Sequence, residues 1–456
     1  MKITRWQLAT VLAVCAIGVG IGAGGRALWP TSGQAATAPS PIQLIAATTD
    51  SAPVGGNAST DALIRSYQQA VRTAPSNPGA YTNLGLAYMQ KERETSDVQY
   101  YQFSDDAAAA ALKLDPRNVE ALTIEAWVDL GRHDFVPAAA MARRAVDADL
   151  TNPDNYANLG DAEANLGQYD AMLSAYQKMA DLKPDLASYN RASYVRWLYG
   201  DLRGATRFML LAIRAGSNQP ENVAWCESQL GDDFFNAGFV LGAQQMYQEA
   251  LKAFPHYARA LAGLASVDVA LHHPGAAIRD YRQAIAVVPL PQYLTGLGDL
   301  YASMGKTVQA QRQYAVIAFI DHIFAINHVR YGIDEALFDA DHNQNLQQAL
   351  SLAGGESKIR HDVQTMDTLA WVLYKNGRFS AAWNAEQQAM RLGTHFAPFY
   401  FHAGMIQAKL GNIAEAQDYL SKALMLNPNF SVLNAPVAQR ELVALNDRAA
   451  SSKGRR

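Results

Sequence analysis

The sequence contains little cysteine and no short catalytic motif. Two cysteines, Cys15 and Cys226, occur in 456 residues, which excludes a disulfide framework and a zinc site built from cysteine pairs. Charged residues make up 18% of the chain and the net charge is -4, so a nucleic-acid partner is disfavoured. A Gly-rich phosphate loop, a nucleophile elbow and an HExxH motif are all absent from the sequence. We therefore expect no enzyme, cofactor or metal.

One acidic stretch resembles a calcium loop in its spacing alone. Asp339, Asp341 and Asn343 alternate as such a loop requires. However, Gln344 stands where the loop needs glycine for its turn, and Leu350 stands where it needs a bidentate glutamate. The stretch is better explained as a turn between two helices. Cys226 follows an aromatic residue, and we expect it to be buried and unreactive.

The N-terminus has the pattern of a membrane anchor. Lys2 and Arg5 precede the uncharged apolar run 8–25, so the N-terminus is expected to stay in the cytoplasm while the rest crosses the membrane. We predict that 1–29 is a retained anchor in the cytoplasmic membrane. The remaining chain would then lie on the far, periplasmic or extracytoplasmic side. The alternative is a signal peptide cleaved after Ala35, which would export the protein.

The residues after the predicted anchor have the composition of a tether. Residues 30–60 are rich in Pro, Gly, Ser, Thr and Ala, so they bury too little apolar surface to fold alone and should form a flexible linker. At the other end, 430–448 is predicted to be a capping helix that covers the last apolar face, and 449–456 a basic tail.

Between these ends the chain repeats itself. Helix-forming residues dominate from Asp61 onward, and Gly or Pro interrupts them at short intervals. Three pairs of residues lie 34 apart: Tyr247 and Tyr281, Ala250 and Ala284, and Pro255 and Pro289. Three further pairs have the same separation: Gly377 and Gly411, Ala382 and Ala416, and Ala389 and Ala423. Thirty-four residues is the length of a helix–turn–helix unit.

The motifs inside the period resemble the tetratricopeptide repeat family. The first helix of that family carries Leu-Gly with an aromatic three residues later, as in "YTNLGLAY" (81–88), "ESQLGDDF" (227–234) and "LTGLGDLY" (294–301); "YANLGDAE" (156–163) lacks the aromatic. The second helix carries an aromatic, a small residue and a closing Pro. The resemblance covers 61–429. It implies an all-α fold, a right-handed α-solenoid of about ten tetratricopeptide-like helix–turn–helix repeats with a C-terminal capping helix.

The resemblance also implies where a partner would bind, because the first helices of such repeats line a concave groove. The groove candidates are Asn83, Asn158, Asp161, Arg191, Tyr194, Trp197, Asp232, Asp299, Trp371, Tyr374, Phe401, His402 and Met405. The three aspartates recur at one inward place. The five C-terminal candidates, from Trp371 to Met405, form an aromatic patch suited to peptide anchors. The alternative for these rings is the core between repeats.

These features together predict a non-catalytic scaffold or adaptor. We expect a protein or peptide partner in the groove, in an envelope assembly or export context, as in bacterial membrane-attached repeat proteins. The alternatives are a self-assembling structural protein that forms homo-oligomers and a regulatory subunit of an enzyme complex. Some family members hold a C-terminal carboxylate with paired Lys and Asn. Asn158 and Arg191 resemble two parts of that clamp, but this sequence lacks the lysines, so this function is not carried over.

Overall fold

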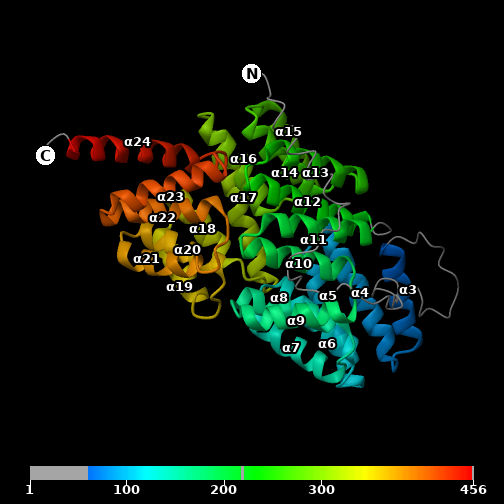
Figure 1. The fold of residues 1–456 in the computed structure, drawn as a ribbon. Helices are drawn as coiled ribbons and strands as arrows, with labels where there is room; N and C mark the ends of the chain where they lie inside the picture. The colour runs from blue at the N-terminus through cyan, green and yellow to red at the C-terminus, as the bar shows by residue number, and fades with distance from the viewer. Residues whose placement is uncertain (1–59, 217–219, 454–456) are drawn as a thin grey trace. The chain divides into compact units, whose positions relative to one another are not determined.

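The computed structural model describes residues 60–216 and 220–453, and these form 22 helices and no strand. A leading helix, α3 (Thr60–Thr73), comes first and a final helix, α24 (Asn434–Lys453), comes last. Between them the helices follow one another in pairs (Figure 1). This confirms the predicted all-α fold of helix–turn–helix repeats. The predicted anchor, 1–29, and the predicted linker up to Ser59 lie outside the described residues.

The ten pairs are built from helices of 10 to 20 residues. In the first five, α4 (Pro78–Thr95) precedes α5 (Gln99–Leu114), α6 (Val119–Gly131) precedes α7 (Phe135–Ala148), α8 (Pro153–Leu166) precedes α9 (Tyr169–Leu182), α10 (Leu186–Leu198) precedes α11 (Leu202–Ala215), and α12 (Pro220–Asn236) precedes α13 (Val240–Ala253). In the others, α14 (Ala258–Ala270) precedes α15 (Pro274–Val287), α16 (Pro291–Ser303) precedes α17 (Thr307–Ile326), α18 (Gly332–Asp341) precedes α19 (Leu346–Glu356), α20 (Val363–Lys375) precedes α21 (Phe379–Ala389), and α22 (Ala397–Leu410) precedes α23 (Ile413–Leu426).

The described residues divide into two compact units. Unit A contains 60–183 and 316–376, and unit B contains 184–315 and 377–453. Each unit therefore combines two segments that are distant in the sequence. In unit B, α24 packs against α22 and α23, as a capping helix would, and it continues to Lys453, past the predicted end at 448.

Side chains at the helix starts satisfy backbone N–H groups that would otherwise lack a partner. Asn152 Oδ1 accepts from the Asp154 N–H at 3.0 Å, and Pro153 opens α8, a position where proline costs nothing. Asp185 forms a capping box with Ser188 at the start of α10. Gly167 ends α8 with φ 75°, which is a left-handed conformation that glycine adopts without strain.

Three glycines of the Leu-Gly pairs, Gly160, Gly231 and Gly298, make room for a tyrosine ring. A Cβ added to Gly160 would lie 2.3 Å from Tyr176 Cε1, and one added to Gly298 would lie 2.3 Å from Tyr314 Cε1. Real Cβ atoms cannot approach a ring so closely. The periodic glycines therefore let the second helix of a pair press its tyrosine against the backbone of the first.

Loops about 195 residues apart meet within each unit. In unit A the Arg330 N–H donates to the Arg132 carbonyl at 2.9 Å. In unit B the Asn427 amide donates to the Phe235 carbonyl at 2.8 Å, across 192 residues of sequence. Gly200 shows how tight these junctions are, because its φ is 77° and an added Cβ would lie 2.6 Å from the Gly393 carbonyl oxygen. The repeat period does not reveal these contacts.

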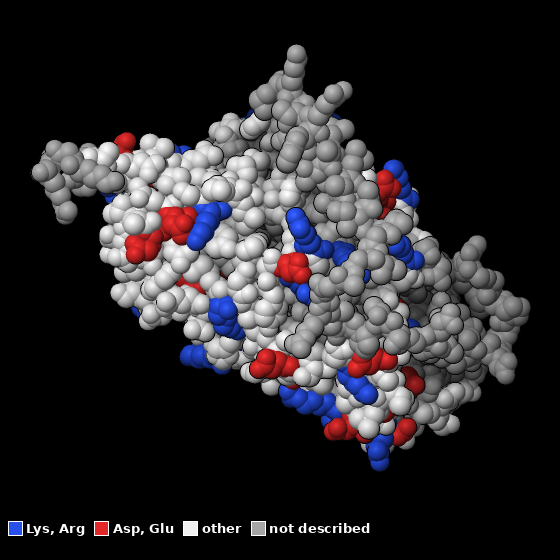
Figure 2. All heavy atoms as spheres, viewed as in Figure 1, with Lys and Arg blue, Asp and Glu red and all other residues white. Residues whose placement is uncertain are grey.

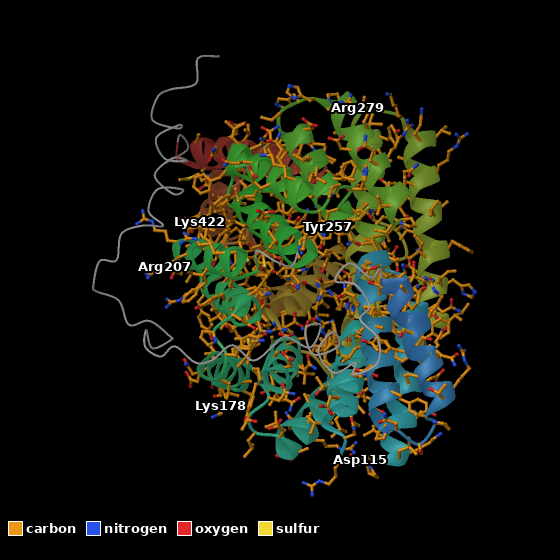
Figure 3. The ribbon with its side chains drawn as sticks, turned by 90° about the vertical axis from the view of Figure 1, so that its right-hand side faces the viewer. Asp115, Lys178, Arg207, Tyr257, Arg279 and Lys422 are labelled. Carbon is orange, nitrogen blue, oxygen red and sulfur yellow. The ribbon has the colours of Figure 1, made fainter. Side chains whose placement is uncertain are left out.

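The surface carries charge of both signs. Figure 2 shows Lys and Arg interspersed with Asp and Glu on the visible face, without an area of one sign. Charged residues of the second helices, such as Lys178 of α9 and Arg207 of α11, are exposed (Figure 3). Among the helices of 60–216 and 220–453, none has both the length and the apolar character needed to cross a membrane.

Candidate functional site

The recurring aspartates of the first helices bind tyrosines of the second helices. The Tyr176 hydroxyl donates to Asp161 at 2.7 Å and the Tyr247 hydroxyl donates to Asp232 at 2.6 Å, each across 15 residues. The same contact joins Tyr314 to Asp299 at 2.7 Å. Burial and the adjacent carboxylate together raise the pKa of Tyr247 and of Tyr314. These three predicted groove residues thus tie the two helices of a pair together.

Repeats without the tyrosine lack the aspartate as well. In the pair α10–α11, Met209 takes the tyrosine place and Tyr194 takes the aspartate place, while Ser193, at the glycine place, donates to the Ala205 carbonyl at 2.8 Å. In the pair α22–α23, an added Cβ on Gly404 would lie 2.7 Å from Leu420 Cγ, and the next residue is Met405. A hydroxyl and its acceptor therefore occur together or not at all, as a buried hydrogen-bonding group requires.

A polar cluster in unit B connects successive first helices. Arg259 of α14 reaches Asp232 of α12 through Nε at 3.0 Å and Nη2 at 2.6 Å, and its Nη2 also donates to Gln229 Oε1 at 2.6 Å. The guanidinium lies 5.2 Å from the ring centroid of Trp225. The Arg259 and Asp232 side chains remain 29% and 31% exposed. We call Trp225, Gln229, Asp232 and Arg259 the arginine cluster.

The second surface feature of unit B is an aromatic cluster, made of Tyr194 and Trp197 of α10 with Phe396. Tyr194 stacks on Trp197 with ring centroids 6.2 Å apart and 21° between planes. Trp197 meets Phe396 edge-on, with centroids 6.0 Å apart. The contact between distant loops holds the cluster together, since the Thr394 hydroxyl donates to the Leu198 carbonyl. Tyr194 is 38% exposed, and Trp197 and Phe396 are half-buried.

Arg191 lies one helical turn before Tyr194 and shares its side of α10. Its Nη1 donates to the Ala187 carbonyl at 3.1 Å, and its side chain is half-buried. Residues three apart on a helix are neighbours on its surface, so Arg191, Tyr194 and Trp197 present one continuous face. This face combines a cation with partly exposed aromatic rings, the residue types that dominate protein-binding hot spots.

Comparison with protein families gives these repeats a name. Family models described as tetratricopeptide repeat match residues 153–186, 228–267 and 397–430. These three segments of the chain are similar to tetratricopeptide repeats. The matched segments contain α8–α9, α22–α23 and the region from α12 into α14, and they belong to both units. No curated protein matches the sequence.

Several solved tetratricopeptide and related helical structures are similar at low identity. The human IFIT1 dimer with m7Gppp-AAAA is 13% identical over 72% of this chain and 76% of its own, with a TM-score of 0.46. Yeast Tom70 is 13% identical over 86% of this chain and 93% of its own, with a TM-score of 0.35. A tetratricopeptide repeat protein from Parabacteroides merdae is 18% identical over 57% and 98%, with a TM-score of 0.33.

The structure buries most of the predicted C-terminal aromatic patch between helices. Trp371 is 2% exposed, stacks on Tyr374 with centroids 4.8 Å apart, and donates from Nε1 to Asp341 Oδ1 at 2.8 Å. Tyr374 is half-buried. Both residues belong to unit A. The expectation that Trp371 is exposed in an open groove is wrong, because its ring fills the space between α18 and α20.

The other three residues of that patch belong to unit B and are also buried. Phe401 is 1% exposed and packs on Phe430 with centroids 5.4 Å apart. His402 is 3% exposed and Met405 is 8% exposed. The expectation that these three side chains are exposed in a groove is therefore wrong. The segment after α23 covers Phe401 through Phe430. The repeat period does not predict this contact.

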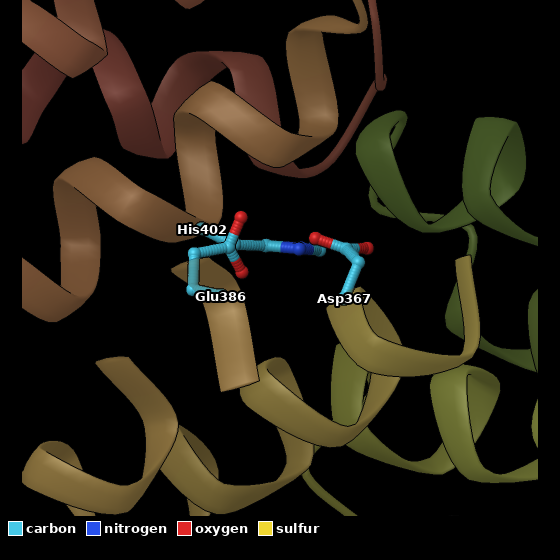
Figure 4. Close-up of side chains that lie close together, drawn as sticks. All are labelled: Asp367, Glu386 and His402. Atoms are coloured by element: carbon cyan, nitrogen blue, oxygen red, sulfur yellow. The ribbon is translucent and has the colours of Figure 1, made fainter. Parts of the chain in front are cut away.

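His402 has a buried carboxylate beside it. Figure 4 shows Glu386 of α21 directed toward His402 of α22, and their ligand atoms lie within 4.8 Å of each other. Glu386 is 0% exposed. Asp367, drawn in the same figure, belongs to unit A. Two ligands from unit B are fewer than the three or four that a protein zinc site uses, so we assign the pair a packing role.

The remaining predicted residues have structural partners or modest exposure. Asn158 is 8% exposed and donates to the Thr123 carbonyl at 3.0 Å, which joins α8 to α6. Asn83 is half-buried in α4. Cys226 is fully buried, and burial raises the pKa of its thiol to about 12, so it is a poor nucleophile.

The calcium-like stretch forms a turn of ordinary hydrogen bonds. Asp339 Oδ1 accepts from the Gln344 and Asn345 side chains at 3.0 and 3.2 Å, and Asn343 Oδ1 accepts from Lys375 Nζ at 2.8 Å. The bonds to Asp339 close the connection between α18 and α19, which is a turn as predicted, and the bond from Lys375 ties this turn to α20.

Two participants in the unit B surface were not predicted from the sequence. Phe396 is almost two hundred residues from Trp197, and Arg259 stands at the start of a first helix, outside the Leu-Gly motif. For Arg259 a signal exists, because an arginine that precedes the motif of one repeat can reach the aspartate of the repeat before it. For Phe396 the repeat pattern carries no signal.

Proposed function

We propose that this protein is a non-catalytic scaffold that binds a protein or peptide partner on unit B. The observation that supports the proposal is the face of α10 formed by Arg191, Tyr194 and Trp197. Aromatic and arginine side chains bury large contact areas at modest entropic cost, so they supply most of the free energy at protein interfaces. The rigid contacts with Phe396 hold the rings in place before a partner arrives, which lowers the cost of binding.

Capture of a partner from solubilised membranes by the full-length chain tests this proposal. The test variant is Tyr194→Ala combined with Trp197→Ala. The control is Tyr199→Ala, because Tyr199 is also an aromatic residue at the end of α10 and is 42% exposed but lies outside the shared face. We expect the double variant to lose a stoichiometric partner and the control to retain it. Equal capture by all three proteins would refute binding at this face.

The absence of catalysis is part of the proposal. The sequence has no local catalytic motif, and the thiol of Cys226 is buried with a raised pKa. Tetratricopeptide repeats are typically non-catalytic scaffolds, which supports this assignment. A regulatory subunit of an enzyme complex would use the same face, and its partner in the capture experiment would be an enzyme.

The envelope context rests on the sequence of the N-terminus. We propose that 1–29 anchors the protein in the cytoplasmic membrane and that the repeats lie on the far side. The apolar run after Lys2 and Arg5 supports this. Mass analysis of the mature N-terminus tests it: a chain beginning at Met1 in the membrane fraction is expected, whereas a soluble chain beginning at Ala36 would show cleavage and export.

A further inference from the structure

Helix α17 exposes an apolar stripe on unit A. The helix is 20 residues long, whereas the second helices before it, α13 and α15, have 14. In its unit A part, four large apolar side chains are exposed: Val316 by 39%, Phe319 by 64%, Ile323 by 37% and Ile326 by 62%. Scattered apolar residues on a surface are ordinary, but a contiguous row marks an interaction site.

The adjacent side of the same helix segment is apolar as well, and it is buried. Ile317, Ile320 and Phe324 are 4%, 9% and 9% exposed. The segment is thus apolar over two adjacent sides, and a helix with so wide an apolar surface is normally covered over most of it. The buried side explains how α17 attaches to its unit. The exposed stripe has no comparable cover among the described residues.

The spacing of the stripe is symmetric. Its residues lie five and two positions before residue 321, and two and five positions after it. If two copies of the helix pair antiparallel across a two-fold axis at this point, Val316 faces Ile326 of the second copy and Phe319 faces Ile323. Every large apolar residue of the stripe then meets another, as an isologous interface requires.

The charge pattern favours a second copy over a membrane surface. A helix that lies on a membrane carries Lys and Arg along its polar side. Residues 313–329 contain neither Lys nor Arg, and His322 is the polar residue exposed beside the stripe. Two uncharged stripes can approach each other without repulsion or desolvation of charge.

We propose that α17 is the contact helix of a homodimer, with the stripes of two copies packed antiparallel. The stripe offers on the order of 400 Å² of apolar surface per copy, compared with about 800 Å² in a standard interface. We therefore expect the dimer to be weak and to dissociate on dilution. Its formation does not involve the aromatic cluster of unit B, so loss of partner capture and loss of dimerisation are separate outcomes.

Sedimentation equilibrium of the full-length chain in mild detergent, over a concentration series, measures the dimer. The test variant is Phe319→Glu with Ile323→Glu, which buries four charges in the paired stripes. The control is Met425→Glu, because Met425 of α23 is 84% exposed and stands outside the stripe. We expect at least a hundredfold weaker dimerisation in the test variant and no change in the control. A monomeric wild-type chain, or an equally dimeric test variant, would overturn the proposal.

Disulfide trapping tests the antiparallel register of the two helices without using the glutamate variants. Single variants Phe319→Cys and Ile323→Cys are prepared with different tags, each with Cys15→Ser; Cys226 is buried and stays unchanged. The antiparallel register predicts that mild oxidation links the two variants to each other far more than either to itself. Linking of each variant to itself alone would contradict this register.

Discussion

The Tyr247 hydroxyl donates a hydrogen bond of 2.6 Å to the Asp232 carboxylate, which also binds Arg259 of the next first helix. One aspartate thus fastens the two helices of its own repeat and the first helix of the repeat that follows. Contacts between neighbouring repeats contribute to the stability of such arrays, so this single contact should matter beyond its own pair.

Tyr247→Phe should lower the free energy of unfolding by about 1–3 kcal/mol, because it removes a hydrogen bond to a charged acceptor. Tyr281→Phe is the matched control. Tyr281 contacts the neutral Ser266 hydroxyl at 3.1 Å, so its loss should cost about 0.5–1.5 kcal/mol. Urea unfolding measures both. A larger loss for Tyr281→Phe would contradict the role assigned to the aspartate.

Gly298→Ala should be destabilising although alanine is the better helix former. The new Cβ would lie 2.3 Å from Tyr314 Cε1, and the displaced ring should cost about 1–3 kcal/mol. Gly354 lies inside α19, where an added Cβ meets no atom within 4 Å. Gly354→Ala should therefore stabilise by about 0.5–1 kcal/mol. Thermal unfolding of both variants measures the two stability changes. Equal destabilisation by Gly298→Ala and Gly354→Ala would contradict the prediction.

The loop contacts in unit B are tested by two glycines with the same backbone conformation. Gly200 and Gly377 have φ of 77° and 74°, so alanine costs about 1–2 kcal/mol of backbone strain at either. At Gly200 the Cβ would also lie 2.6 Å from the Gly393 carbonyl oxygen, whereas at Gly377 it meets nothing within 4 Å. Gly200→Ala should be the more destabilising.

Hydrogen exchange shows where the loss occurs. In Gly200→Ala, peptides around Leu198 and around Thr394 should lose protection together, since their backbones meet. In Gly377→Ala the peptides around Leu198 should be unchanged. Loss of protection at Leu198 without any at Thr394 would mean that the contact does not hold the two segments together.

Asp233 should make the stability of unit B depend on pH. Its side chain is 3% exposed, and burial raises its pKa to about 7, compared with about 3.9 in an unfolded chain. The folded state therefore holds the proton more tightly, so stability falls as the pH rises from about 4 to about 7 and stays low above that. Asp233→Asn should raise stability at pH 8 by about 1–3 kcal/mol and have little effect at pH 4.

Urea unfolding at pH 4, 6 and 8 measures how the free energy of unfolding depends on pH. The difference between wild type and Asp233→Asn should grow with pH. A variant that is less stable than wild type at pH 8 would show that the ionised carboxylate is stabilised in the folded chain, and that the predicted direction of the pH dependence is wrong.

The helices and their pairing could be predicted from the sequence, since they follow from local spacing. The Leu-Gly pairs, the tyrosines that press on Gly160 and Gly298, and the closing prolines all act within one period. The same spacing predicts the recurring aspartates, but it does not predict that they accept hydrogen bonds from Tyr176 and its counterparts, because the motif specifies an aromatic ring and not its hydroxyl.

The surface of the chain was harder to predict, because exposure depends on contacts that span many repeats. Trp371 and Phe401 have the spacing of groove residues, yet neighbouring helices and the chain after the last repeat cover them. Conversely, Trp197 acquires its partner Phe396 through the junction of two distant loops. A repeat period specifies what lies beside each helix in its own pair. It does not specify which loops meet when they are about 195 residues apart in the sequence.

Hydrogen exchange of the full-length chain, with and without the captured partner, tests the proposed binding face most directly. We expect binding to add protection to peptides spanning 187–198 and 394–399. We expect Tyr194→Ala with Trp197→Ala to abolish this added protection while the exchange of the free chain stays unchanged. Added protection confined to other repeats, with these two segments unaffected, would contradict the proposed binding face.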